Sequence, residues 1–98
     1  MRVYISGAIS NDPDYRLKFY NAKVRLKGEG FDVINPTVLD SFEGLSYEEY
    51  MKLDLCLLDM CDAIYMLKGL EKSCGANREY GYALAKDYTI MFEEGAHR

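Results

Sequence analysis

The chain has 98 residues, a formal net charge of −4 and a sequence pI near 4.9. This length suits one domain with a single small core, so we expect residues 1–98 to form one domain. The acidic balance argues against binding a nucleic-acid polymer, which requires a basic face, although local donors could still hold a small anion. No apolar run approaches the ~20 residues of a membrane span and no secretory signal is seen, so we expect a cytoplasmic protein without a membrane partner.

The cysteines give no sign of a metal site. Cys56, Cys61 and Cys74 lack the CxxC spacing of zinc ligands, and His97 is the one histidine of the chain. An odd number of cysteines with this spacing favours reduced thiols. We therefore expect no metal and no cofactor.

The first half of the chain predicts two strands with a helix between them. Residues 2–6 form a short apolar run, and apolar residues then recur at helical spacing from Tyr15 to Leu26. Asp12 is a suitable cap, Pro13 fits the first helical position, and Gly28 or Gly30 ends the helix. The sequence "FDVIN" (31–35) predicts a second strand that stops before a proline, and the turn-rich stretch 36–45 predicts a long loop.

The second half continues the alternation of strands and helices. The sequence "SYEE" (46–49) matches a capping box and predicts a helix from there to Asp59 or Cys61. Residues 62–67 and 88–92 predict strands, with a loop and a helix at 75–86 between them. The order βαβαβαβ predicts an α/β three-layer sandwich of the flavodoxin or Rossmann-like type, with a parallel sheet of four or five strands ordered 2-1-3-4.

The predicted strand order also locates a ligand site. In open α/β sheets, ligands bind beyond the carboxyl ends of the strands, where the winding reverses. Here that point lies between the first and third strands. The loops at 6–10 and 68–77 should therefore meet at the ligand.

Asp54 interrupts the apolar face of the predicted second helix. Its neighbours on that face are Tyr50, Met51, Leu57 and Leu58. Because burying a lone carboxylate is costly, Asp54 should be paired or should line a cavity. The alternative is an acid that caps a neighbouring loop.

A second apolar set lies on the flank of the same helix, at Leu53, Cys56 and Met60. A helix that is apolar on two sides usually has two packing partners. This pattern predicts a homodimer packed partly through the helix. Burial under a loop or terminus is the alternative.

Glu79 poses a similar question in the stretch "KSCGANREYGYA" (72–83). The residues expected to face the sheet are Ala76, Tyr80, Ala83 and Leu84, and Glu79 lies at the edge of this stripe. The nearby helix N-terminus favours an ionised carboxylate, which would act as a nucleophile or as an electrostatic partner. Gly81 in mid-helix predicts tight packing, because glycine there costs about 1 kcal/mol relative to alanine. The alternative is a solvated helix glutamate.

The start of this helix has parts that bind anions. Ser73 is a suitable N-cap with a hydroxyl donor, and Gly75 permits close backbone approach. Free N–H groups extend to Asn77, and Ser6 and Gly7 lie on the facing loop. These residues are candidates for holding a phosphate.

Three segments together resemble a known family: "YISGAI", "DLCLLDMCDAIYML" and "SCGANREYGYALAKDYTI". They resemble the nucleoside 2-deoxyribosyltransferase-like superfamily, and within it a small branch, domain of unknown function 4406. The pattern is also similar to that of 2'-deoxynucleoside 5'-monophosphate N-glycosidases. The resemblance covers nearly the whole chain and implies the fold predicted above.

The resemblance implies catalytic roles for three residues. In that superfamily the glutamate of an E-x-G-x-A segment attacks C1' of the sugar and displaces the base, so "EYGYA" assigns this role to Glu79. Asp54 stands eight residues before Asp62 and would orient the sugar or assist the reaction. Tyr4 of the first strand would approach the nucleophile.

The resemblance also implies a substrate. Six residues before the glutamate, the transferases have an aspartate that holds the sugar 5'-hydroxyl, whereas the monophosphate glycosidases have a serine that holds phosphate; this chain has Ser73. The backbones of Gly7, Ala8 and Ile9 are carried over as phosphate contacts. The sequence thus predicts an N-glycosidase acting on a (deoxy)nucleoside 5'-monophosphate or related nucleotide. The alternatives are a non-catalytic nucleotide-binding or sequestering protein, a nucleoside deoxyribosyltransferase, and an interaction protein that binds a foreign partner.

Overall fold

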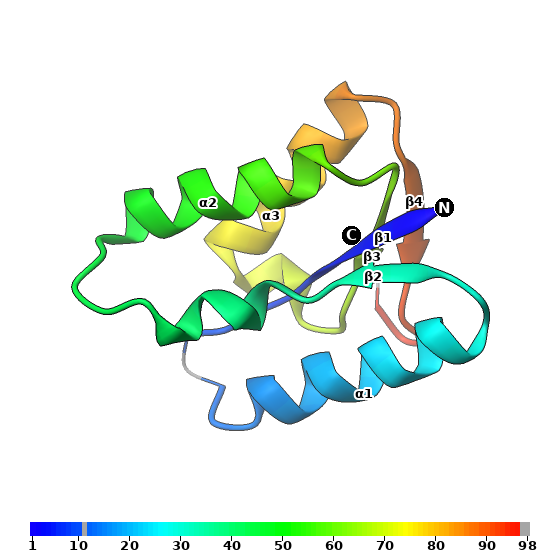
Figure 1. Ribbon diagram of the computed structural model, residues 1–98, viewed down its shortest axis with the longest axis horizontal. Coiled ribbons are helices and arrows are strands. Elements are labelled where there is room, and N and C mark those ends of the chain that lie inside the picture. The colour runs from blue at the N-terminus through cyan, green and yellow to red at the C-terminus, as the bar shows by residue number, and fades with distance from the viewer. Residues whose placement is uncertain (11, 97–98) are drawn as a thin grey trace.

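The computed structural model describes residues 1–10 and 12–96. Strands and helices alternate along the chain (Figure 1). In chain order the elements are β1 (Arg2–Ser6), α1 (Tyr15–Gly28), β2 (Asp32–Ile34), η1 (Pro36–Ser41), α2 (Tyr47–Asp59), β3 (Ala63–Met66), η2 (Leu70–Lys72), α3 (Cys74–Ala85) and β4 (Thr89–Phe92). The two η elements are 3₁₀-helices inside the regions expected to be loops.

The four strands form one parallel sheet in the order β2-β1-β3-β4. This confirms the predicted α/β class and strand order. At the centre, Tyr4 is paired with Ile64 and Ser6 with Met66. The reversal of winding between β1 and β3 is therefore real, and the loops after these strands lie side by side at the carboxyl edge.

Helices cover both faces of the sheet, with α1 on one side and α2 and α3 on the other (Figure 1). Because side chains alternate along a strand, β1 contributes to both layers. Val3 and Ile5 pack in the cluster beneath α1, whereas Tyr4 packs in the cluster beneath α2 and α3. The chain is a three-layer sandwich, as predicted.

The predicted helix caps are largely confirmed. Ser46 and Glu49 form both hydrogen bonds of a capping box, and Ser73 accepts the N–H of Ala76 at the start of α3. The predicted start of α1 is wrong: the helix begins at Tyr15 with Asp14 as its N-cap, so Pro13 precedes the helix, and Asp12 accepts the N–H of Asp14 (3.0 Å) in the turn before it. Among the described residues, no helix has the length and apolar character needed to cross a membrane.

Two predictions for α3 are wrong. Leu84 does not face the sheet, because its side chain is 52% exposed. Gly81 is exposed too, and a Cβ placed there would have no neighbour within 4 Å. The helix is rotated so that Ala76, Glu79 and Ala83 form its buried stripe.

Candidate active site

Glu79 is buried between α3 and the central strand of the sheet. Its side chain is 5% exposed. The hydroxyl of Tyr4 donates to Oε2 of Glu79 (2.7 Å), and the hydroxyl of Ser6 donates to Oε1 (2.6 Å). Each carboxylate oxygen is therefore held by a donor from β1. The position at the edge of the stripe, expected from the sequence, is in fact interior.

Burial raises the pKa of Glu79, in the direction opposite to the one expected from the helix N-terminus. Loss of solvent raises the pKa of Glu79 from 4.5 to about 7, the negative charge of Asp54 adds to this, and the hydrogen bonds from Ser6 and Tyr4 act in the opposite direction. The expectation of a clearly ionised carboxylate is therefore corrected, because the acid is close to half-protonated near pH 7. The pKa of Tyr4 is also raised well above its usual value, first by burial and then by the charge of Glu79.

Asp54 lies on α2 and faces the same space. Burial and then the charge of Asp40 raise its pKa from 3.8 to about 6. Within residues 1–10 and 12–96, its carboxylate accepts no hydrogen bond and joins no ion pair. The alternative that Asp54 caps a loop is thus not supported, and the prediction that it lines a cavity is confirmed.

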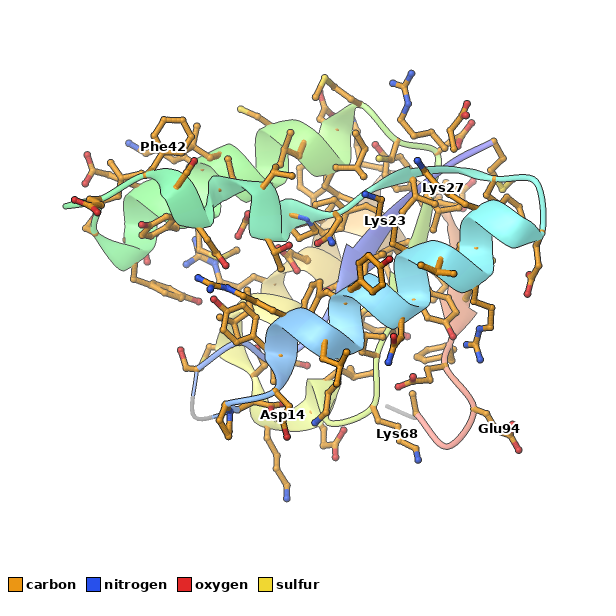
Figure 2. All side chains as sticks on the ribbon, turned by 60° about the horizontal axis from the view of Figure 1, so that its bottom comes forward. Asp14, Lys23, Lys27, Phe42, Lys68 and Glu94 are labelled. Carbon is orange, nitrogen blue, oxygen red and sulfur yellow. The ribbon has the colours of Figure 1, made fainter. Side chains whose placement is uncertain are left out.

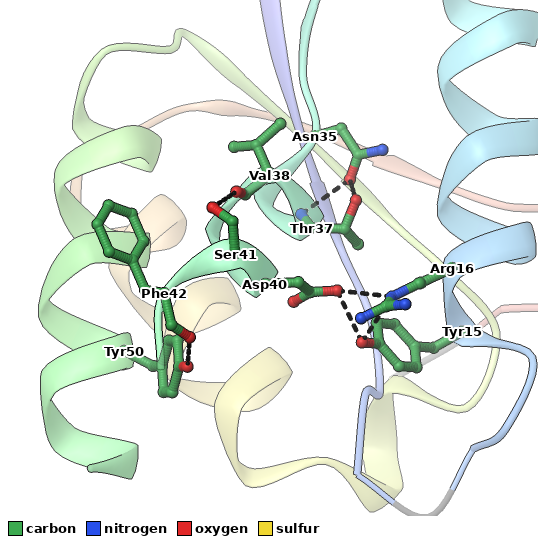
Figure 3. A network of polar contacts seen from close by, with 9 residues as sticks. All are labelled: Tyr15, Arg16, Asn35, Thr37, Val38, Asp40, Ser41, Phe42 and Tyr50. Atoms are coloured by element: carbon green, nitrogen blue, oxygen red, sulfur yellow. Dashed lines mark hydrogen bonds and ion pairs between the residues drawn. The ribbon is translucent and has the colours of Figure 1, made fainter. Parts of the chain in front are cut away.

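A polar network fixes η1 against α1 (Figure 3). Oδ2 of Asp40 accepts from the hydroxyl of Tyr15 (2.7 Å) and from Nε of Arg16 (2.9 Å). On the other side of η1, the hydroxyl of Tyr50 donates to the carbonyl of Phe42 (2.6 Å). These bonds connect the segment after β2 to α1 and α2, and so hold one wall of the site.

The walls enclose a cavity of about 380 Å³. The carboxylates of Asp40, Asp54 and Glu79 line it together with the aromatic rings of Tyr4, Phe19, Tyr47 and Tyr50. The loop after β1 and the start of α3 complete the wall through Gly7, Ile9, Ser10, Lys72, Ser73, Cys74, Gly75 and Ala76, and the remaining contacts are Pro36, Leu39 and Met51. Acidic groups within mainly apolar walls are the composition of a small-molecule site.

One glycine, Gly7, permits a close approach that shapes this cavity, whereas a Cβ at Gly75 would make only ordinary contacts. A Cβ on Gly7 would lie 2.9 Å from Cβ of Leu67, so only glycine fits where the loop after β1 passes the end of β3. A Cβ on Gly75 would lie 3.6 Å from the hydroxyl of Tyr47 and 3.4 Å from Sδ of Met51. The first turn of α3 is therefore in contact range of α2.

Comparison with known sequences places the chain in a family. A sequence model described as "Domain of unknown function (DUF4406)" matches residues 1–92. The chain belongs to this family. A comparison with curated proteins gives no match.

This DUF4406 protein is also similar to a solved structure, "2-desoxiribosyltransferase from Leishmania mexicana". The TM-score is 0.70 at 23% sequence identity, and the match covers 93% of this chain and 62% of the other. The chain therefore shares the fold of that transferase, which is the fold that the three sequence segments predicted. The chain spans about three fifths of the length of that transferase.

The predicted site residues of this DUF4406 protein do not all reach the cavity. Tyr4, Asp54, Glu79, Gly7, Ile9, Ser73 and Gly75 line it. Ser6 reaches it only through its hydrogen bond to Glu79, and Ala8 lines a neighbouring hollow. Asn77 is correctly placed near the helix start, but its amide donates to the carbonyls of Leu70 (3.2 Å) and Ser73 (2.8 Å) and holds the preceding loop.

Sequence reasoning did not identify Asp40, Tyr15 and Arg16 as part of the site. Asp40 is 25 positions from Tyr15 and 24 positions from Arg16, so no local sequence period connects it to them. The one signal was indirect, since the loop at 36–45 follows a strand next to the switch point. A carboxylate in that loop was a candidate on position alone.

The cysteines and the acids do not assemble a metal centre in the described part of the chain. Cys61 is buried, Cys56 and Cys74 are exposed, and all three are free thiols. No group of three or more His, Cys, Asp or Glu side chains is arranged to hold a metal ion among the described residues. His97 lies outside the described residues.

The second apolar set on α2 is partly exposed. Cys56 is exposed and Met60 is 53% exposed, whereas Leu53 is half-buried. A loop or terminus therefore does not cover the whole set. The homodimer stays a prediction.

Proposed function

We propose that this DUF4406 protein is an N-glycosidase that cleaves the base–sugar bond of a (deoxy)nucleoside 5'-monophosphate or related nucleotide. The observation that carries the proposal is the buried carboxylate of Glu79, held by Tyr4 and Ser6 at the wall of a mainly apolar cavity. A desolvated carboxylate with fixed orientation is suited to attack an electron-poor carbon. Its pKa of about 7 leaves a substantial ionised fraction at neutral pH.

In the first step, the ionised Glu79 forms a bond from a carboxylate oxygen to C1' of the sugar while the C1'–N bond to the base breaks. The electron pair of that bond goes to the base, which takes up a proton. Asp54, with a pKa of about 6, is the acid within the cavity that can supply this proton. Tyr4 and Ser6 fix the carboxylate for attack.

In the second step, water attacks C1' of the glycosyl ester and the bond to Glu79 breaks. Asp54, now a carboxylate, accepts the proton of that water. The products are the free base and the sugar phosphate, and both carboxyl groups return to their starting states. Attack by a second base in place of water would give transfer instead of hydrolysis.

The 5'-phosphate would lie against the start of α3. The Ser73 hydroxyl and the first N–H groups of α3 would supply donors there, whereas the N–H groups of Ala76 and Asn77 are already bonded to Ser73. An aspartate at position 73 would repel the phosphate. The backbones of Gly7, Ala8 and Ile9 face this region from the end of β1. Asn77 is left out of the binding set because its amide nitrogen is committed to the loop carbonyls.

The proposal is tested by incubating the protein with the common nucleosides and (deoxy)nucleoside 5'-monophosphates and detecting free base by chromatography. Glu79→Gln should lower base release by about 10³-fold or more, since the nucleophile is removed. Glu94→Gln, at an exposed glutamate in the turn after β4 that does not line the cavity, is the matched control and should leave release unchanged. Equal release by wild type and Glu79→Gln would refute the assignment.

A further inference from the structure

A second hollow of about 440 Å³ lies beside the cavity. It is formed by Ala8, Ser10, Asp12, Lys18, Lys68, Gly69 and Lys72. Ser10 and Lys72 line both spaces, so the hollow adjoins the cavity on the side of the loops that follow β1 and β3. The two spaces therefore meet at these two residues.

The hollow has a surplus of positive charge in a chain whose net charge is −4. Three lysines line it against one aspartate, and that aspartate is already occupied. Asp12 pairs with Lys18 (2.7 Å) and accepts the N–H of Asp14. Among the described residues, Lys68 and Lys72 belong to no ion pair.

Lys18 has three acidic neighbours and is hydrogen-bonded to one of them, Asp12. The negative charges of Asp12, Asp14 and Glu93 all raise the pKa of Lys18. The Glu93 carboxylate is engaged by the backbone N–H of Lys68 (2.9 Å). The ammonium groups available to a bound anion are thus those of Lys68 and Lys72.

The stem of Lys68 packs closely against the segment after β4. A Cβ on Gly95 would lie 2.6 Å from Cε of Lys68, so the glycine makes room for this side chain. In Figure 2, Lys68 and Asp14 are labelled at the same edge of the molecule, whereas Lys27 lies at the opposite end of α1. The lysine pair is therefore a local feature of the loops near the site.

We infer that the substrate is a nucleoside 5'-diphosphate or triphosphate, whose phosphate chain passes Ser10 and Lys72 and ends beside Lys68. The inference rests on the proposed function for the position of the sugar. A single phosphate at the start of α3 would leave the hollow without a ligand. Each further phosphate adds negative charge where two ammonium groups can interact with it.

The test is calorimetric titration of the Glu79→Gln protein, in the presence of a metal chelator, with the mono-, di- and triphosphates of deoxyadenosine, deoxyguanosine, deoxycytidine and thymidine. For the base that binds, the diphosphate should bind at least about tenfold more tightly than the monophosphate. Lys68→Ala should remove most of that difference. Lys27→Ala changes an exposed lysine outside the hollow and should preserve it.

Equal affinity for mono- and diphosphates would overturn the inference, as would a difference that survives Lys68→Ala. The proposed function fails separately. If wild type releases base from the monophosphate and the affinity does not depend on phosphate number, only the inference is wrong. If the tighter binding of the diphosphate depends on Lys68 but no nucleotide releases its base, the inferred phosphate site is correct and the proposed glycosidase activity is wrong.

Discussion

The two faces of the sheet differ in chemistry although the same strand contributes to both. The cluster beneath α1 consists of Val3, Ile5, Phe19, Ala22, Leu26, Ala63, Tyr65 and Leu67. On the other face, Tyr4 and Ser6 direct their hydroxyls to a buried carboxylate. One layer therefore supplies apolar stabilisation, while the other carries a charged group that costs stability.

The difference is clearest at two buried tyrosines. The hydroxyl of Tyr4 donates to Glu79, whereas the hydroxyl of Tyr65, on the α1 face, has no hydrogen-bond partner among the described residues. Both rings are buried in the same sheet, on neighbouring strands. Both tyrosines are thus buried, but only the hydroxyl of Tyr4, on the face covered by α2 and α3, holds a residue of the candidate site.

The largest stability effect should come from the α1 face. Leu26 is 2% exposed, so Leu26→Ala should lower the free energy of unfolding by about 2–5 kcal/mol through lost burial and a cavity. Activity per folded molecule should not change, because Leu26 does not line the site. Urea denaturation measures the predicted loss of stability, and base release from the same sample measures the predicted unchanged activity. A changed KM in Leu26→Ala would show that the α1 face also affects the site.

Stability of the other face should depend on pH. The folded-state pKa of Glu79 is raised from 4.5 to about 7, so its favourable contribution is present at low pH and is lost as the pH rises toward 7 and above. This loss amounts to roughly 3 kcal/mol in wild type and is absent in Glu79→Gln. The free energy of unfolding of the variant, relative to wild type, should therefore increase between pH 4 and pH 8. A pH-independent difference in urea denaturation would show that Glu79 is not buried as described.

The two tyrosines give a matched pair of substitutions. Tyr4→Phe removes a hydrogen bond to a charged group, worth about 1.5–3 kcal/mol, so the pKa of Glu79 should rise further. Because the pKa of Asp54 lies below that of Glu79, the alkaline limb of the kcat/KM profile should then move to higher pH by about one unit or more, and the maximum of kcat/KM should fall. Tyr65→Phe should leave both the profile and the stability near wild type. Equal shifts in the two variants would contradict a specific role for Tyr4.

The smallest effect is expected at Asp40. Its charge is the second cause of the raised pKa of Asp54, after burial. Asp40→Asn should therefore lower the pKa of Asp54 and, because that pKa lies below the pKa of Glu79, move the acid limb of the kcat/KM profile to slightly lower pH. Because the two carboxyl groups interact, the apparent pKa values of the two limbs, near 6 and 7, belong to the Asp54–Glu79 pair and not to either residue alone. An acid limb that moves to higher pH in Asp40→Asn would rule out this electrostatic link.

Local patterns in the sequence predicted the elements of the fold well. Alternating strands and helices gave the order of the sheet, and Ser46 and Ser73 marked helix starts because N-caps depend on residues only three positions apart. The family segments pointed to Tyr4, Asp54 and Glu79, which do lie around one cavity. Periodicity also placed Asp54 on the buried side of its helix.

What depended on contacts distant in sequence was predicted less well. The rotation of α3 decides the burial of Glu79 and the exposure of Leu84, and it is fixed by Tyr4 and Ser6, more than 70 positions away. The raised pKa of Glu79 has this burial as its largest cause, which the position near a helix N-terminus did not indicate. Asn77 was assigned to the ligand because its position fitted, whereas its amide holds a loop.

The central claim is that the carboxylate of Glu79 bonds to C1' of a nucleotide, and intact-mass spectrometry tests it most directly. The protein would be incubated with a 2'-fluoro analogue of a nucleotide that it cleaves, since the fluorine slows breakdown of a glycosyl ester. We predict release of one equivalent of base, a mass increase equal to the sugar phosphate, and assignment of that mass to the peptide containing Glu79. Base release with the added mass on another residue, or with no added mass, would contradict the account.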